Sequence, residues 1–123
     1  MPSRVYLFII QKQMARTLLT DLELMVLLAV MRLGEDAYGV TITREIERTT
    51  SRNIAVAVVY STLDRLEDRA LVTSFVGDPT PERGGRGRRF FRVTSRGVRQ
   101  TRDTRNALVA LWTGVPELRG GEA

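Results

Sequence analysis

The sequence contains neither cysteine nor histidine. Without cysteine, the chain has no disulfide, no thiolate nucleophile and no cysteine-ligated metal site. Without histidine, it lacks the usual general base near neutral pH and the ligands of most zinc sites. Paired carboxylates and Lys12, the single lysine, are still present. The composition nevertheless favours a protein that is not an enzyme and that holds no metal or cofactor.

Long apolar runs are also missing. The longest, residues 24–31, has eight residues, whereas a membrane-spanning helix needs roughly 20. The apolar segment 5–10 has six residues and is followed directly by polar ones. It is too short for a signal peptide and lacks a cleavage site of small residues. We therefore expect a cytoplasmic protein that does not associate with a membrane.

Because lysine is nearly absent, arginine carries the positive charge. The formal net charge is +5, and residues 83–105 alone hold nine arginines and one acidic residue, Asp103, a local net charge of +8. Such concentrated charge is typical of a surface that binds a polyanion, most often nucleic acid. The alternative is an arginine-rich surface that is only solvated.

Three helices are expected in the first part of the chain. Thr20, with Glu23 three residues later, has the form of a capping box, which predicts a helix over about 20–33. This helix is apolar nearly all round and is therefore expected to be buried. A second helix is expected over about 38–49 and a third over about 55–69, each preceded by helix-breaking residues.

The predicted third helix has two different faces when its residues are placed ~100° apart. The core face, centred on Leu63, also comprises Val56, Val59, Leu66 and Ala70. The opposite face carries Val58, Ser61 and Arg65, with Thr62 and Arg69 at its borders. One side is therefore expected to pack inside the protein, while the other presents polar and cationic groups.

Two β-prone segments, 71–76 and 88–94, flank a loop rich in glycine and proline. This pattern predicts a hairpin with a long arginine-rich tip. Phe90 and Phe91 are neighbours on the second strand, so one is expected in the core and the other on the opposite face. A last helix is expected over about 95–112.

Three helices followed by a hairpin is the element order of a winged helix-turn-helix. The predicted fold class is mainly α with a small β-hairpin (α+β), a winged helix-turn-helix with an additional C-terminal dimerisation helix. We divide the chain into an N-terminal arm or tail (1–19), a winged-helix DNA-binding domain (20–94), the dimerisation helix (95–113) and a tail (114–123). In this arrangement the third helix enters the major groove, and the hairpin, called the wing, flanks it.

Three segments carry a resemblance to a known family: Ala37-Tyr38-Gly39-Val40 followed by Ile42, then Tyr60–Glu67, then 85–94 followed by Gly97. Together they resemble the PadR family of bacterial transcriptional regulators, in its short subfamily, over about residues 19–112. The resemblance implies a dimeric winged-helix protein. Most members of the family are repressors, and some of them respond to phenolic acids or lipophilic drugs. The expected partners are double-stranded DNA, a second copy of the chain and a small hydrophobic effector.

The chain departs from the family pattern at two places. Ala70 stands where relatives usually have glycine after the third helix, which predicts a different helix end. Residues 56–59 are Val, Ala, Val and Val, where many relatives have small polar residues and glycine. The family's rules for base recognition therefore do not transfer directly.

The candidate DNA-binding residues lie on the third helix and on the wing. They are Ala57, Val58, Tyr60, Ser61, Thr62, Arg65, Arg83, Arg86, Arg88 and Arg89. Tyr60 is either a phosphate ligand, as the resemblance implies, or a half-buried packing residue. Arg65 either contacts a base or phosphate or forms an ion pair with Asp64 or Asp68 along the helix.

Base recognition is expected to be unusual. With Val56 assigned to the core, the third helix would meet the groove with Ala57 and Val58, whose side chains form no hydrogen bonds. An apolar group in the major groove recognises the thymine methyl group. The hypothesis is a half-site with a thymine opposite Val58, with hydrogen bonds from the polar residues further along the helix and groove shape recognised at the wing.

The second half of the last helix, residues 107–112, is more apolar than one packed face requires. In a domain this small, such a patch usually marks an interface. We predict a dimer through Leu108, Leu111 and Trp112, with the helix after Thr20 as the partner surface.

The predicted function is sequence-specific, DNA-binding transcriptional regulation, as a repressor. The alternative is a winged-helix protein–protein interaction module without specific DNA binding. The two differ in salt dependence, which is strong for DNA binding. An RNA-binding function is less favoured because the sequence indicates no platform of exposed aromatic residues.

Overall fold

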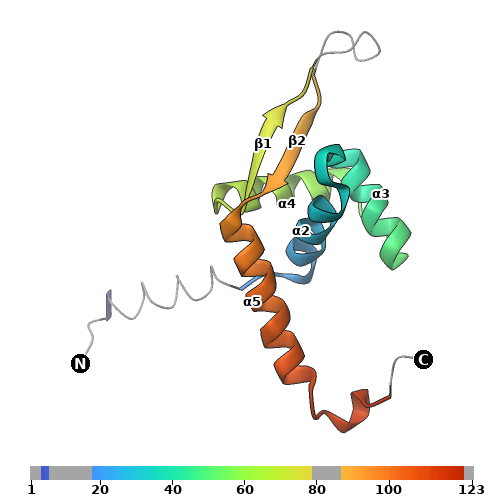
Figure 1. The fold of residues 1–123 in the computed structure, drawn as a ribbon, viewed down its shortest axis with the longest axis vertical. Helices are drawn as coiled ribbons and strands as arrows, with labels where there is room; N and C mark the ends of the chain where they lie inside the picture. Colours follow the sequence, from blue (N-terminus) through green and yellow to red (C-terminus); the bar gives the residue numbers. More distant parts are fainter. Residues whose placement is uncertain (1–3, 6–17, 79–86, 121–123) are drawn as a thin grey trace.

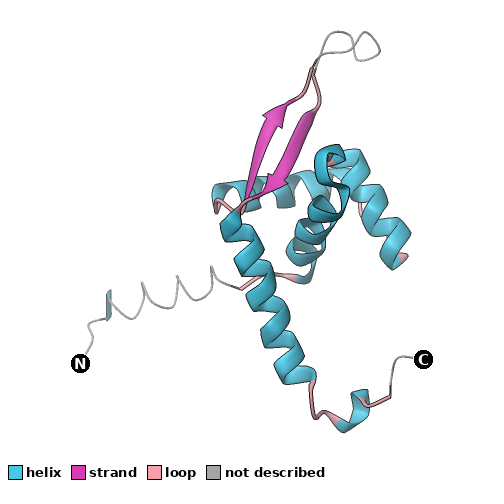
Figure 2. Cartoon of the chain, in the orientation of Figure 1, coloured by secondary structure: helices cyan, strands magenta, loops and turns pink. Residues whose placement is uncertain are grey.

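The computed structural model describes residues 4–5, 18–78 and 87–120. Its elements follow the order α2 (Asp21–Leu33), η1 (Gly34–Asp36), α3 (Gly39–Thr50), α4 (Val56–Asp68), β1 (Val72–Val76), β2 (Arg89–Val93), α5 (Ser95–Trp112) and η3 (Pro116–Leu118). Figures 1 and 2 show α2, α3 and α4 packed around one centre, the hairpin rising beside them and α5 leaving the body of the domain. The predicted α+β winged-helix fold with an additional C-terminal helix is confirmed.

The start of α2 is held by the predicted capping box. The Thr20 hydroxyl accepts a hydrogen bond from the Glu23 amide at 3.1 Å, and the Glu23 carboxylate accepts one from the Thr20 amide at 2.8 Å. Glu23 is buried and its second oxygen pairs with Arg69 at 3.1 Å. The cap therefore also joins the first turn of α2 to the residue that follows α4.

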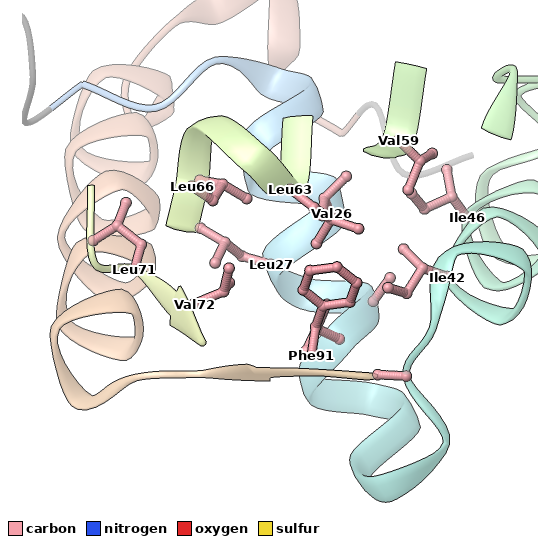
Figure 3. Close-up of a cluster of buried hydrophobic side chains, with 13 residues drawn as sticks. Val26, Leu27, Ile42, Ile46, Val59, Leu63, Leu66, Leu71, Val72 and Phe91 are labelled. Carbon is pink, nitrogen blue, oxygen red and sulfur yellow. The ribbon is translucent and has the colours of Figure 1, made fainter. Parts of the chain in front are cut away.

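The core lies between α2, α3, α4 and the inner face of the hairpin. Its fully buried side chains come from all these elements and include Leu27, Ile42, Leu63, Leu71 and Phe91. Figure 3 shows the Phe91 ring pointing among the aliphatic side chains of the helices. Its neighbour Phe90 lies on the other face of the strand, as predicted from the alternation of side chains along a strand.

The hairpin is attached to the start of α3. In the antiparallel register Phe75 lies opposite Phe90, and Phe90 also forms a β-bridge with Tyr38 on its other side. The Phe91 amide donates to the Ala37 carbonyl at 2.9 Å. The wing is therefore hydrogen-bonded to the segment that leads into α3, in addition to its packing on α4.

Three expectations about burial are wrong. Val56, assigned to the core, is 41 % exposed because the core begins one turn later, at Val59. Ala70 is also exposed, since the chain has already left α4. Two residues of α2, Leu28 and Met31, are 44 % and 38 % exposed. This helix is therefore not buried on all sides.

Ala70 ends α4 in the left-handed conformation, with φ at 60°. Its amide donates to the Glu67 carbonyl at 2.9 Å, and the Leu71 amide donates to the Leu66 carbonyl at 2.9 Å. These are the hydrogen bonds of a Schellman-type helix end, in which glycine is the usual residue. The expectation that Ala70 gives a different helix end is therefore wrong: the helix ends in the geometry usual for glycine, with alanine in the left-handed position.

We predict that Ala70→Gly stabilises the protein. The left-handed conformation costs an L-residue roughly 1–2 kcal/mol. Glycine avoids this cost, but its more flexible unfolded state lowers the free energy of unfolding by about 0.4–1 kcal/mol. The free energy of unfolding should therefore rise by about 0.5–1 kcal/mol in denaturant titrations. Ala57→Gly, at an exposed helical position, is the control and should lower the free energy by roughly 1 kcal/mol. An Ala70→Gly protein no more stable than the parent would contradict the assignment.

Only the first half of α5 packs on the domain. Gly97 and Thr101 are buried, and a Cβ at Gly97 would overlap the Leu71 carbonyl, so glycine allows the helix to cross the base of the hairpin. From Asn106 onward every α5 residue is exposed. Across the described ranges, no helix is long and apolar enough to cross a membrane.

Candidate nucleic-acid interface

One face of α4 is turned away from the core and carries most of the predicted contact residues. Val58 is 43 % and Tyr60 36 % exposed, and Ala57, Ser61 and Arg65 are exposed with them. Five of the six residues expected on this helix therefore share one accessible surface.

Thr62 does not belong to that surface. It has no exposed area, and its hydroxyl donates to the Val58 carbonyl at 2.8 Å. The backbone satisfies the hydroxyl inside the helix, which is why a polar residue can occupy a core position here. The expectation that Thr62 offers a hydrogen bond to DNA is wrong for this conformation.

The first turn of α4 exposes only apolar side chains. Its N-cap, Ala55, forms no side-chain hydrogen bond, and Val56, Ala57 and Val58 follow it on the surface. The nearest exposed hydroxyl, that of Ser61, donates to the Val58 carbonyl at 3.0 Å. Val56 therefore joins the two apolar residues that the sequence placed on this face.

Tyr60 connects α4 to the beginning of α3. A Cβ at Gly39 would overlap the Tyr60 ring and hydroxyl, so the ring lies directly on the first turn of α3. The side chain nevertheless keeps 36 % of its surface exposed. Tyr60 therefore packs on α3, as one of the two alternatives drawn from the sequence expects, and its contact with a phosphate stays a prediction.

Arg65 has no carboxylate partner among the described residues. Its guanidinium makes one long hydrogen bond, 3.4 Å, to the Thr62 hydroxyl oxygen. The ion pair with Asp64 or Asp68 that the sequence left open is not formed, since Asp64 pairs with Arg89 instead. Arg65 therefore offers an uncompensated positive charge on the exposed face of α4.

Arg89, by contrast, is paired twice. Its guanidinium donates to Asp64 at 3.1 Å and to Glu67 at 2.5 Å, both on α4. Glu67 also accepts hydrogen bonds from the Ser74 hydroxyl at 2.6 Å and amide at 3.1 Å. The Ser74 hydroxyl, followed by Arg89, holds the pKa of Glu67 below its usual value against the effect of burial. We call Asp64, Glu67, Ser74 and Arg89 the wing clasp.

The outer face of the wing carries a continuous stack of aromatic rings and arginines. The Arg88 guanidinium lies 4.4 Å from the centre of the Tyr38 ring. Tyr38 meets Phe90 edge-on at 5.5 Å, and Phe90 stacks on Phe75 at 5.7 Å. Arg92 covers Phe75 at 5.0 Å. The ring faces thus contact each other or guanidinium groups, so they do not form an open platform for bases.

The remaining two candidates, Arg83 and Arg86, lie outside the residues that the structure describes. Arg92, Tyr38 and Glu67 were not among the predicted contact residues, and Asp64 was named only as an alternative ion-pair partner of Arg65. Strand alternation could have placed Arg92 beside Phe90, but the contacts between distant segments have no local signal.

A second surface lies between α2 and α5. A groove of about 560 Å³ is lined by Leu24, Leu28, Met31, Val98, Thr101, Arg102, Arg105, Leu108 and Val109. The predicted dimerisation residues are strongly exposed: Leu108, which lines the groove, by 51 %, and Leu111 and Trp112, which do not, by 76 % and 61 %. The apolar part of α2 that was expected to be buried borders this groove.

Comparison with known proteins places these features in a family. The sequence profile described as "Transcriptional regulator PadR-like family" matches residues 27–103. A protein of Lysinibacillus sphaericus called protein X is 31 % identical over 88 residues, which cover 70 % of this chain and 74 % of that protein.

Solved structures share the fold at lower identity. A PadR-like transcriptional regulator from Bacillus cereus superposes with a TM-score of 0.64 at 20 % identity, covering 82 % of this chain and 93 % of its own. A PadR family transcriptional regulator from Eggerthella lenta gives a TM-score of 0.62 at 23 % identity, covering 96 % and 98 %.

Proposed function

Because the chain belongs to the PadR-like family of transcriptional regulators, which are not enzymes, we propose that it is a sequence-specific DNA-binding repressor that acts as a dimer. In the proposed complex α4 lies in the major groove and the wing contacts the flanking backbone. The observation that carries the proposal is the exposed face of α4, where Arg65 has no acidic partner within residues 18–78 and 87–120 and the wing is fixed to the same helix by Arg89.

Dimerisation is supported by the exposed second half of α5 and the groove beside it. We place the second copy's α5 against this region, since the same apolar patch on each chain would then be covered by its counterpart. Two copies of α4 would contact half-sites about one helical turn, ~34–36 Å, apart. The small hydrophobic effector implied by the family resemblance stays a prediction.

The proposal is tested by selecting bound fragments from random duplex DNA and measuring the affinity of the selected operator at several salt concentrations. Each phosphate contacted should contribute about 0.9 to the magnitude of the log–log salt slope. Arg65→Ala should weaken operator binding by about 1–3 kcal/mol if this residue contacts a base. Arg119→Ala, at an exposed position near the C-terminus, is the matched control for charge.

Two outcomes would overturn the proposal. The first is a protein that enriches no duplex, which favours the alternative of a protein-interaction module. The second is an affinity independent of salt, because binding to phosphates releases counterions and must weaken as salt rises.

A further inference from the structure

The wing clasp brings two acidic residues to the helix that faces DNA in the proposed function. Asp64 precedes Arg65 on α4, and Glu67 lies one turn further on. Their side chains are 59 % and 34 % exposed. Carboxylates near a phosphate backbone repel it, and juxtaposed like charges cost several kcal/mol. An acidic pair on a recognition helix therefore requires a compensating charge.

Arg89 provides that charge from β2, across a separation of 25 residues from Asp64 and 22 from Glu67. The flat guanidinium donates from one nitrogen to each carboxylate, which uses its fork geometry. One of its faces lies 4.8 Å from the centre of the buried Phe91 ring. Arg89 is thus held on three sides by groups of its own chain.

Glu67 extends the same connection to the other strand of the wing. Through Ser74 it holds β1, while through Arg89 it holds β2. Both strands are thereby attached to one carboxylate of α4. This attachment acts together with the backbone hydrogen bond from Phe91 to Ala37 in setting the angle between the wing and the helix.

We propose that Arg89 is a positioning residue and not a phosphate ligand: it fixes the wing on α4 and offsets half of the negative charge of Asp64 and Glu67 so that this helix can approach DNA. The inference rests on the proposed DNA-binding function. It differs from the sequence-based expectation, in which Arg89 belongs to the set of wing arginines that contact the backbone directly.

The decisive experiment is a cycle of operator affinities for the parent protein, Arg89→Met, the double variant Asp64→Asn/Glu67→Gln and the triple variant that combines them. Methionine keeps the apolar stem of arginine but removes the charge. Arg89→Met should bind about tenfold more weakly or worse, because two carboxylates are then unpaired. In the triple variant the affinity should return to within about threefold of the parent, since coupled residues are not additive.

A direct phosphate contact predicts a different result. The triple variant would then bind as weakly as Arg89→Met, and the salt slope of both would fall by about 0.9. That result would overturn the proposal. Arg89→Lys gives a second test, because a single ammonium keeps the charge but does not reproduce the two-pronged contact. It should bind with intermediate affinity, whereas an affinity equal to that of the parent would count against the clasp.

Hydrogen exchange in the free protein tests the positioning role without DNA. The Gly77 amide donates to the Arg88 carbonyl at 2.7 Å, at the end of the strand pair next to the hairpin loop. Arg89→Met should accelerate exchange of this amide about tenfold or more by loosening the wing. The matched control is Glu45→Gln, which removes the ion pairs with Arg32 and Arg48 and should leave both exchange at Gly77 and DNA affinity unchanged.

The two failures are distinguishable. A parent protein that binds no duplex would overturn the proposed function, while the exchange rates would still decide whether Arg89 fixes the wing. Unchanged exchange in Arg89→Met would overturn the positioning role even in a protein that binds DNA normally.

Discussion

Replacing Leu108, Leu111 and Trp112 together by serine should convert the protein into a folded monomer and weaken operator binding by about 100-fold or more. All three side chains are more than half exposed, and none belongs to the hydrophobic core. The substitutions should therefore remove the interface while the domain still folds. The loss of affinity follows because a dimer places two α4 helices on one operator, and the second contact is then intramolecular.

Sedimentation velocity at micromolar concentration gives the oligomeric state, and circular dichroism confirms that the variant is folded. Leu118→Ser changes an apolar residue of η3 that is 37 % exposed and is the control, with no expected effect on assembly. Leu28→Glu, on the α2 side of the groove, should dissociate the dimer as well if α2 is the partner surface. A triple variant that still sediments as a dimer, or a parent protein that is monomeric, would contradict the assignment.

The elements of the fold were predictable because their signals are local. The capping box at Thr20 needs only the residue three positions later, and the structure forms it. Breakers between apolar segments mark the ends of the helices, so each observed boundary lies close to the expected one. Alternation along the second strand correctly predicted that Phe90 and Phe91 lie on opposite faces, and the structure shows that Phe91 is the one in the core.

Burial within α4 was harder to predict, because a helical wheel assumes that every turn meets the core. The buried residues run only from Val59 to Leu66, so Val56, on the same side, extends past the packed region. Thr62 shows the reverse error. Its hydroxyl bonds to the carbonyl four residues earlier, which removes the penalty for burying a polar group.

The arginines were the least predictable part of the site. Counting charge treats them as equivalent, yet Arg65 has no acidic partner in the described part of the chain, whereas Arg89 is bound to two carboxylates. The partners are more than twenty residues apart in sequence, so only the folded chain brings them together. The stack of Arg88 and Arg92 on aromatic rings has the same origin.

Replacing Val58 by glutamate should abolish sequence-specific DNA binding, lowering operator affinity by about 100-fold or more, because a carboxylate in the groove faces phosphates of the same charge. Val58 is 43 % exposed and Val56 41 %, so the change adds no strain to the core. Leu118→Glu introduces the same charge at a similarly exposed position of η3 and is the control. Equal affinities for Val58→Glu and the parent would show that the first turn of α4 does not enter the groove.

The same surface predicts how the bases are recognised. The first turn of α4 exposes Val56, Ala57 and Val58, and apolar side chains of this kind can recognise thymine only through its methyl group. Changing single thymines of the operator to uracil removes only that methyl, so at least one position should lose ~0.5 kcal/mol or more, roughly the scale of one buried methyl. In Val58→Ala the sensitivity to that thymine should disappear, because the partner of the methyl group has gone. If every single change to uracil leaves the affinity intact, Val58 does not contact a methyl group, and specificity must come from Arg65 and from groove shape at the wing.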